Sequence, residues 1–375
     1  MEPFYYFYPL FGTVGFVQAI TLGTLLMVLN RPKYRSTLYL GLLLILFALG
    51  LVPRILDSLG TFERYPDLYL LPFDFFWFYF PIFYLYTQHA CIFSNQKKKF
   101  WVLYPGIIVF FLQLYVFFLP YETKLNLVQT LAFDAYTLIK LSYGLGIGIY
   151  TLKLLNRHKV EVYNYFSFVK SKELNWARIY MTFAIIGSLV YTILIRTIPD
   201  SHFARLFFLS FDLILIYWIS YHGVQQRNVR SLLAKKKEFD LRRAKSIDES
   251  EGSSKHKKSM QELMQQIHEH MATSESYTHP ELTVVDLAEK LNTHPKRISA
   301  AINSIENQNF NAYINSLRVK KMEKLLKNEE VDKLSIEGIG YEVGFHSKSA
   351  FYSAFKKFTG TTPSKYKEDM MAQHR

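Results

Sequence analysis

The chain has 375 residues, a single cysteine and a formal net charge of +13 at pH 7. One cysteine excludes an intrachain disulfide, and 50% apolar with 17% aromatic residues is more than soluble proteins usually carry. The positive charge is compatible with two partners, nucleic acid or an anionic membrane surface. The composition is divided at about Gly223: apolar runs with short charged loops precede it, and a hydrophilic segment rich in Lys, Glu, Ser and Gln follows it.

The first part of the chain contains apolar runs of the length that a membrane-spanning helix needs, about 20 residues. We count seven such runs in the sequence. They cover approximately residues 9–29, 37–53, 70–93, 101–119, 131–153, 177–198 and 206–223. The expected fold is therefore all-α, a seven-span helical membrane bundle followed by a cytoplasmic helical domain.

The distribution of Lys and Arg predicts the orientation of this bundle. The loops after the first, third and fifth runs carry twelve of these residues, and the alternate loops carry five. Because cytoplasmic loops are enriched in Lys and Arg, we expect the N-terminus outside and the C-terminus in the cytoplasm.

Several ionisable residues lie inside the apolar runs, where a charge is costly and often functional. They are Asp74, Asp134, Lys140 and Asp212. Asp134 and Lys140 are about 9 Å apart along one helix, so we expect their partners on other helices, with Asp212 or Asp74 facing Lys140. Two interpretations stay open: a signal-sensing site, or structural ion pairs between helices that bind no ligand.

A linker of residues 224–259 separates the apolar part from the C-terminal part. Its first half is basic and is expected to continue the last span along the inner leaflet. Its second half has the Ser, Gly and charged composition of a flexible joint. The predicted domains are thus residues 1–223, 224–259 and 260–375, the last beginning with a helix whose Met260, Leu263, Met264 and Ile267 share one apolar face.

Two short helices joined by a tight turn follow. Thr283 and Asp286 form a predicted capping box at the start of the first helix, and Asn292 is suited to the left-handed conformation that ends it. Thr293 is expected to cap the second helix, with Pro295 in its first turn. This arrangement is a helix-turn-helix, whose second helix can enter the major groove of DNA.

The same pattern recurs after one long connecting helix, predicted from Asn311 to Asn328 because that stretch lacks Gly and Pro. Ser335 caps a helix, Gly344 begins a turn, and Ser347 caps the next helix, which Gly360 ends. His268 and His270 lie in the helix that begins the C-terminal domain, and because they are two residues apart they point to different sides of it. No metal site and no cofactor is expected.

The C-terminal motifs resemble a known family. LTVVDLAEKLN, YEVGF, SAFYSAFKKFTG and TPSKY, within residues 280–368, stand at the spacing of the DNA-binding domain of the AraC family (AraC/XylS type) of bacterial transcription regulators. The resemblance covers about a quarter of the chain. It implies that both second helices read successive major grooves.

The resemblance also implies which residues read DNA. Carried over by position, they are Lys296, Arg297, Ser299 and Ala300 in the first reader helix and Lys348, Ser349, Tyr352 and Ser353 in the second. The sequence departs from the family pattern at Asn307, Gly338 and Gly340. Because two glycines in one short helix each cost about 0.5–1 kcal/mol relative to alanine, we expect the second unit to be loosely folded alone.

Together these features predict a membrane-bound one-component transcription regulator that is not an enzyme. The resemblance to bacterial regulators implies that the membrane is the bacterial cytoplasmic (inner) membrane. The expected partners are double-stranded DNA, the lipid bilayer, a second copy of the chain, RNA polymerase, and a small-molecule or membrane stimulus. Three alternatives remain: a transporter or channel with a regulatory DNA-binding tail, a membrane histidine kinase, and a helical interaction module that never touches DNA. We hypothesise that the membrane part controls the dimer state or spacing of the readers.

Overall fold

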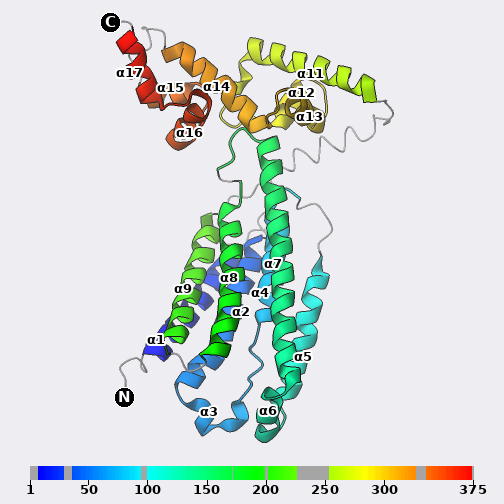
Figure 1. Ribbon diagram of the computed structural model, residues 1–375, viewed down its shortest axis with the longest axis vertical. Coiled ribbons are helices and arrows are strands. Elements are labelled where there is room, and N and C mark those ends of the chain that lie inside the picture. Colours follow the sequence, from blue (N-terminus) through cyan, green and yellow to red (C-terminus); the bar gives the residue numbers. More distant parts are fainter. Residues whose placement is uncertain are drawn as a thin grey trace. The chain divides into compact units, whose positions relative to one another are not determined.

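The protein is all-α over the residues that the computed structural model describes, 7–28, 36–93, 99–170, 172–198, 202–225, 253–326 and 335–373. Within these ranges there is no strand, only an isolated antiparallel bridge between Phe166 and Thr283. The chain forms two compact units (Figure 1). Unit 1 is Met1–His158 with Leu174–Arg230, and unit 2 is Lys159–Glu173 with Ser231–Arg375.

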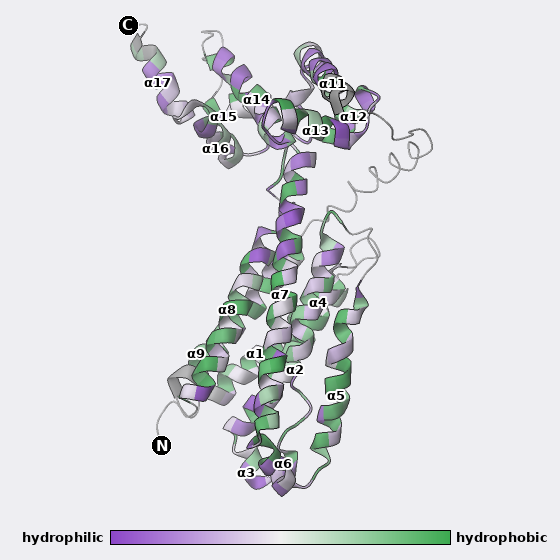
Figure 2. Cartoon of the chain, turned by 45° about the vertical axis from the view of Figure 1, so that its right-hand side comes forward, coloured by the Kyte–Doolittle hydropathy of each residue, from purple (hydrophilic) through white to green (hydrophobic). Residues whose placement is uncertain are grey.

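Unit 1 is a bundle of mostly apolar helices. Its elements are α1 (Phe7–Val28), α2 (Ser36–Ser58), α3 (Thr61–Arg64), η3 (Pro66–Leu68), α4 (Phe76–Ala90), η4 (Phe100–Leu103), α5 (Tyr104–Phe117), α6 (Tyr121–Val128), α7 (Leu131–Tyr165), α8 (Asn175–Thr197) and α9 (His202–Gln225). Figure 2 shows hydrophobic residues along most of these helices. Ile108, Phe111 and Ile193 each expose more than half of their surface, which is compatible with a lipid environment.

Six helical segments among the described residues are long and apolar enough to cross a membrane: α1, α2, η4 with α5, α7, α8 and α9. The third predicted span, residues 70–93, differs from expectation. Residues 69–75 are not helical, and the following helix, α4, has only 15 residues. Pro72 lies in this stretch, and the Asp74 carboxylate accepts a hydrogen bond from the Phe76 amide (3.2 Å) at the start of α4. Most of α4 is buried in the bundle core.

The α1–α2 contact depends on two glycines. A Cβ atom at Gly41 would lie 2.6 Å from the Gly23 carbonyl oxygen, and one at Gly23 would lie 2.9 Å from the Gly41 carbonyl oxygen. Small residues allow helix backbones to approach this closely in membrane proteins.

Unit 2 contains the two helix-turn-helix motifs. Its elements are α11 (Ser253–Ser274), η5 (Ser276–Thr278), α12 (Val284–Lys290), α13 (Pro295–Ile305), α14 (Phe310–Leu326), α15 (Ile336–Glu342), α16 (Lys348–Thr359) and α17 (Pro363–Gln373). The predicted apolar face of α11 is buried. Residues 226–252 and 327–334 lie outside the described residues, and with them most of the predicted linker. The helix that the sequence places after the linker begins at Ser253, earlier than expected.

The first motif forms largely as predicted. The Thr283–Asp286 capping box is present, and Asn292 has a φ of 47° in the turn. One prediction was wrong: the N-cap of α13 is His294, whose ring nitrogen accepts a hydrogen bond from the Lys296 amide, rather than Thr293. Thr293 is instead buried in the turn, where its amide donates to the Ala288 carbonyl.

In the second motif the Ser335 and Ser347 caps are confirmed, since their hydroxyls accept from the Gly338 and Ala350 amides. Gly344 has a φ of 100°, and a Cβ there would overlap the Thr278 backbone. A Cβ at Gly340 would lie 2.9 Å from the Phe351 ring. Gly340 thus allows α15 to pack closely on α16.

Candidate functional site

The first candidate reader helix, α13, is partly covered. Lys296, Arg297 and Ala300 are exposed, as the DNA-reading assignment requires. Ser299 is only 8% exposed, because its hydroxyl donates a hydrogen bond to the Asn164 carbonyl oxygen at 3.0 Å. Unlike the other three predicted reading residues of α13, Ser299 is therefore covered in this structure.

The second candidate reader helix, α16, presents Lys348, Ser349 and Ser353 on its exposed side, with Tyr352 half-buried. The Lys348 ammonium is 2.5 Å from the Glu337 carboxylate. This hydrogen bond lowers the pKa of Glu337 and raises the pKa of Lys348, so both are charged at neutral pH. The Tyr352 hydroxyl is 3.4 Å from that of Ser364.

A segment from far earlier in the chain lies on this domain. Residues 159–173, which we call the α7 extension, comprise the last turns of α7 and the chain that follows it, and they belong to unit 2. The Ser167 amide and hydroxyl both donate to the Leu282 carbonyl oxygen, at 3.1 and 2.7 Å. Asn311 of α14 donates to the carbonyl oxygens of Phe166 (3.3 Å) and Ser167 (2.6 Å).

The α7 extension reaches both candidate reader helices. Beyond the bond from Ser299 to Asn164, the Lys170 ammonium donates to the Ser349 hydroxyl at 3.3 Å. The Phe168 ring packs 4.4 Å from the ring of His346, which lies in the turn before α16. One short segment therefore touches a predicted DNA-reading residue in each motif.

Arg318 of α14 anchors this arrangement. Its guanidinium is almost fully buried and donates to the Tyr277 carbonyl (2.7 Å), the His279 carbonyl (2.8 Å) and the Ser167 hydroxyl (3.3 Å). Burial lowers the pKa of Arg318 to about 10, so the group stays charged at pH 7. The sequence predicted neither Arg318 nor Ser167, because pattern alone does not bring together residues 151 apart.

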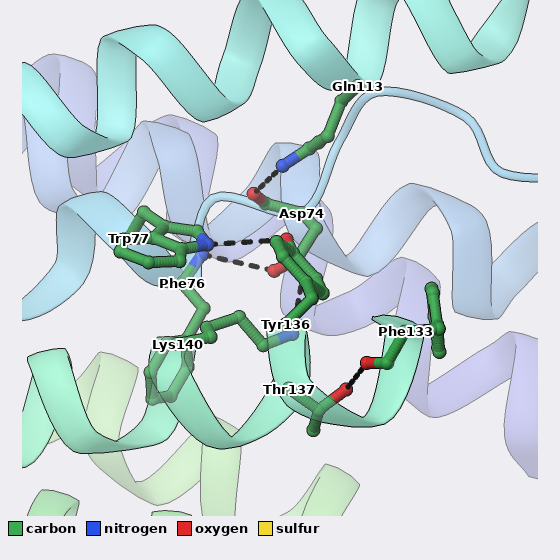
Figure 3. Close-up of polar contacts among 8 residues, drawn as sticks. All are labelled: Asp74, Phe76, Trp77, Gln113, Phe133, Tyr136, Thr137 and Lys140. Atoms are coloured by element: carbon green, nitrogen blue, oxygen red, sulfur yellow. Dashed lines mark hydrogen bonds and ion pairs between the residues drawn. The ribbon is translucent and has the colours of Figure 1, made fainter. Parts of the chain in front are cut away.

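In unit 1, Asp74 and Lys140 form one polar cluster (Figure 3). The Lys140 ammonium is 2.7 Å from the Asp74 carboxylate, and the Tyr136 hydroxyl donates to the same oxygen at 3.5 Å. Gln113 of α5 donates to the Asp74 backbone carbonyl at 3.0 Å. The Phe76 amide of α4 donates to the other carboxylate oxygen of Asp74, so α4, α5 and α7 all contact this aspartate. The Trp77 indole of α4 also donates to the Tyr136 hydroxyl at 3.2 Å.

The other two predicted acids have different partners. Asp212 of α9 does not face Lys140; it pairs with Arg54 of α2 at 2.7 Å. Asp134 pairs with Arg196 of α8 at 2.6 Å. Arg54 lies in the loop directly after the second predicted run and Arg196 lies near the end of the sixth, and the sequence does not show that either is paired.

Two of these three ion pairs line a common cavity. Its volume is about 420 Å³, and its walls come from α2, α3, the non-helical residues 69–75, α4, α7, α8 and α9. Arg54, Asp212, Asp74 and Lys140 all lie on its wall, and aromatic rings supply much of the rest. Asp134 and Arg196 are not among the described lining residues. A cavity of this size with a few convergent polar groups is typical of a small-molecule site.

Comparison with known proteins addresses the C-terminal part. Residues 287–369 match a family described as "Helix-turn-helix domain". The chain is 36% identical over 89 residues to the Msm operon regulatory protein of Streptococcus mutans serotype c (strain ATCC 700610 / UA159). These 89 residues are 24% of this chain and 31% of that relative. The chain therefore spans about a third of this curated relative. No solved structure matches the chain significantly. The matches support a DNA-binding regulator, and residues 287–369 of this chain are an AraC-type helix-turn-helix domain.

Proposed function

We propose that the protein is a membrane-bound one-component transcription regulator. Unit 1 spans the membrane and senses a signal, and unit 2 binds specific duplex DNA through α13 and α16. The reading residues in this proposal are Lys296, Arg297, Ser299 and Ala300 in α13 and Lys348, Ser349, Tyr352 and Ser353 in α16. The regulator-type domain favours a protein that is not an enzyme.

The observation that carries this proposal is the continuity of α7. The helix runs unbroken from Leu131 to Tyr165. Its residues up to His158 belong to unit 1, where Lys140 bonds to Asp74. Its last turns belong to unit 2, where the α7 extension contacts the candidate reader helices. A displacement of α7 in the bundle therefore has a covalent route to the DNA-binding domain.

The docked α7 extension and DNA compete for the same groups. The Ser299 hydroxyl bonds to Asn164, and the Ser349 hydroxyl accepts from Lys170. In that arrangement Ser299 is buried and its hydroxyl hydrogen is used, so it cannot contact a base, and the Lys170 side chain occupies one acceptor position of Ser349. The signal thus acts by shifting the population between a docked form that binds DNA weakly and a released form that binds it well.

The test weakens the docking by substitutions in the α7 extension, so that the sequences of the reader helices α13 and α16 stay unaltered. The double variant Ser167→Ala/Lys170→Ala removes the Ser167 hydroxyl bonds and the Lys170 bond to Ser349. Each of these hydrogen bonds contributes about 1 kcal/mol, net of the bonds to water that it replaces, to the free energy of docking. We therefore expect the full-length protein in nanodiscs to bind a duplex selected from a random-sequence pool roughly tenfold more tightly.

The matched control is Lys153→Ala, which removes an exposed lysine of α7 within unit 1 and should leave DNA affinity unchanged. Electrophoretic mobility shifts of both variants against the selected duplex and against random DNA provide the measurement. Unchanged or weaker specific binding by the double variant would contradict competition between docking and DNA.

A further inference from the structure

The cavity in unit 1 has the chemistry to bind a particular class of ligand. We propose that it binds a short apolar peptide with free termini, whose ammonium group joins Asp74 and whose carboxylate joins Arg54. This inference deepens the proposed function by naming the class of signal. It rests on the charges, spare bonding capacity and walls of the cavity.

The charges on the cavity wall cancel. Arg54 and Lys140 supply two positive charges, and Asp74 and Asp212 supply two negative charges. A ligand with a single net charge would leave one ion without a counter-ion in an apolar site, which is strongly unfavourable. The site therefore favours a ligand whose own charges also cancel.

Asp74 and Arg54 are the more accessible acid and the more accessible base of the cavity: their side chains are 39% and 47% exposed, against 16% for Asp212 and 22% for Lys140. Each can also take a further partner without giving up the present one. The two oxygens of a carboxylate offer about four acceptor positions. Asp74 uses its oxygens for Lys140, Tyr136 and the Phe76 amide. A guanidinium has five N–H donors, and the hydrogen bond of Arg54 to Asp212 uses Nη1. A ligand ammonium at Asp74 and a ligand carboxylate at Arg54 extend both pairs and keep the site neutral.

The remaining wall selects the body of the ligand. It is largely aromatic, with Phe47, Phe76, Phe80, Tyr79, Tyr180 and Phe211 among its members. Rings of this kind pack against apolar and aromatic side chains. The volume of about 420 Å³ lies within the range of small-molecule sites, about 300–1,000 Å³, and limits the ligand to a short peptide.

The backbone of residues 69–75 supports a ligand site as well. Non-helical backbone at membrane depth is tolerated where it is buried in protein or lines a cavity. Leu70, Leu71, Phe73 and Asp74 come from this stretch and line the cavity. Broken helices of this kind form the binding sites of many membrane transport proteins.

The experiment uses the full-length protein in phosphatidylglycerol nanodiscs and the tripeptide phenylalanyl-leucyl-phenylalanine, with dissociation constants from calorimetry. We expect measurable binding of the free tripeptide. Its N-acetylated form and its C-amidated form should each bind at least tenfold more weakly, because each block leaves a net charge on the ligand and removes one of the two proposed contacts.

Paired variants assign each terminus without leaving an orphan charge. Asp74→Asn/Lys140→Met should erase only the effect of N-acetylation, and Arg54→Met/Asp212→Asn should erase only the effect of C-amidation. The control Asp134→Asn/Arg196→Met removes an ion pair away from the cavity lining. It should leave both effects unchanged.

Three results would overturn the assignment. They are equal binding of free and doubly blocked peptide, no binding of the free peptide, and preferences that survive both cavity variants. Nanodiscs containing phosphatidylethanolamine separate a second source of the same charges. Suppose that this lipid stabilises the protein against heat, that both cavity variants abolish the stabilisation, and that no peptide binds. The ligand would then be a lipid headgroup, and the peptide assignment would be refuted.

These measurements contain no DNA, so their failure leaves the docking experiment of the proposed function intact. If the peptide binds as described and yet does not change the DNA affinity of the full-length protein, the ligand class stands. In that case the proposed coupling through α7 fails.

Discussion

Gly340 shows how a single missing Cβ determines a packing contact. In an open helix, replacing glycine by alanine would be stabilising by about 0.5–1 kcal/mol. At Gly340 a Cβ would lie 2.9 Å from Cδ1 and 3.0 Å from Cγ of Phe351. Phe351 is a buried member of the core shared by α14, α15 and α16, so its ring has little room to move.

We therefore predict that Gly340→Ala destabilises unit 2 by about 1–3 kcal/mol, the usual cost of overpacking a core. Chemical denaturation followed by circular dichroism measures the change. The double variant Gly340→Ala/Phe351→Leu should cost less than the sum of the two single variants, because a smaller side chain accepts the new methyl group. Stabilisation by Gly340→Ala would show that the contact is not tight.

At the scale of elements, α13 and α16 each combine a buried face with an exposed basic edge. Ile298, Ala301 and Ile302 are buried in α13, and Phe351, Ala354 and Phe355 are buried in α16. Lys296 and Lys348 stand near the N-termini of these helices, the ends that contact base edges in helix-turn-helix complexes.

Lys296→Ala and Lys348→Ala should each weaken binding to a selected duplex by about 1–3 kcal/mol and weaken binding to random DNA less. Competition binding with labelled selected duplex and unlabelled random duplex separates the two effects. Lys320→Ala, an exposed lysine of the connecting helix α14, is the control and should have little effect on specific binding. Equal losses on both duplexes would mean that the two lysines contact phosphate alone.

Local signals made most elements predictable from the sequence. The capping residues Thr283, Ser335 and Ser347 and the positive φ of Asn292 follow from capping and turn chemistry. The helix Phe310–Leu326 follows from a stretch that lacks Gly and Pro. Two features did not follow. Hydropathy does not distinguish a helix from the non-helical residues 69–75, because both are apolar. Nor does any local pattern bring Ser167 to Leu282.

For the charged residues of the bundle, the sequence indicates which positions are unusual but does not show which residues pair. Their positions in apolar runs marked Asp74, Lys140 and Asp212 as unusual. Which of them pair depends on how the helices are rotated about their axes, and the sequence of one chain contains little information about that rotation. Arg54 therefore appeared as a loop residue, although it is the partner of Asp212.

At the scale of the whole molecule, the proposed function requires a defined topology. Helix α2 contributes its C-terminal half to the cavity, α7 and α9 contribute mainly their N-terminal halves, and α8 contributes residues about its middle, from Tyr180 to Tyr191. With the orientation expected from the Lys and Arg distribution, these ends of α2, α7 and α9 lie toward the outside. A ligand from outside the cell would then reach the cavity, and the α7 extension would lie in the cytoplasm.

Reporter enzymes fused after Lys99 and after Gly223 should therefore report the cytoplasm, whereas a fusion after Tyr121 should report the outside. Alkaline phosphatase and a fluorescent protein, which are active on opposite sides of the membrane, provide the readout. This outcome requires that α4, with its preceding non-helical residues, completes a crossing. A cytoplasmic signal at Tyr121 would overturn the orientation.

The chain passes between its units three times: within α7, between Glu173 and Leu174 before α8, and after α9. If the signal travels through α7, lengthening the connection after α9 should matter little. Insertion of ten Gly and Ser residues after Gly252 should leave the transcriptional response of the cell largely intact, with protein level and membrane insertion as controls. Loss of the response would point to a rigid relay through the connection after α9.

The central claim is that the α7 extension and DNA exclude each other on unit 2. Its most direct test is a reversible crosslink between Asn164→Cys and Ser299→Cys, at positions where the hydroxyl and carbonyl oxygen are 3.0 Å apart. The native Cys91 is fully buried and stays in place. Mass spectrometry confirms the bond, and the two single variants control for each substitution. We predict that the oxidised protein loses specific binding to the selected duplex and regains it on reduction. Equal affinity of the crosslinked and reduced forms would contradict the account.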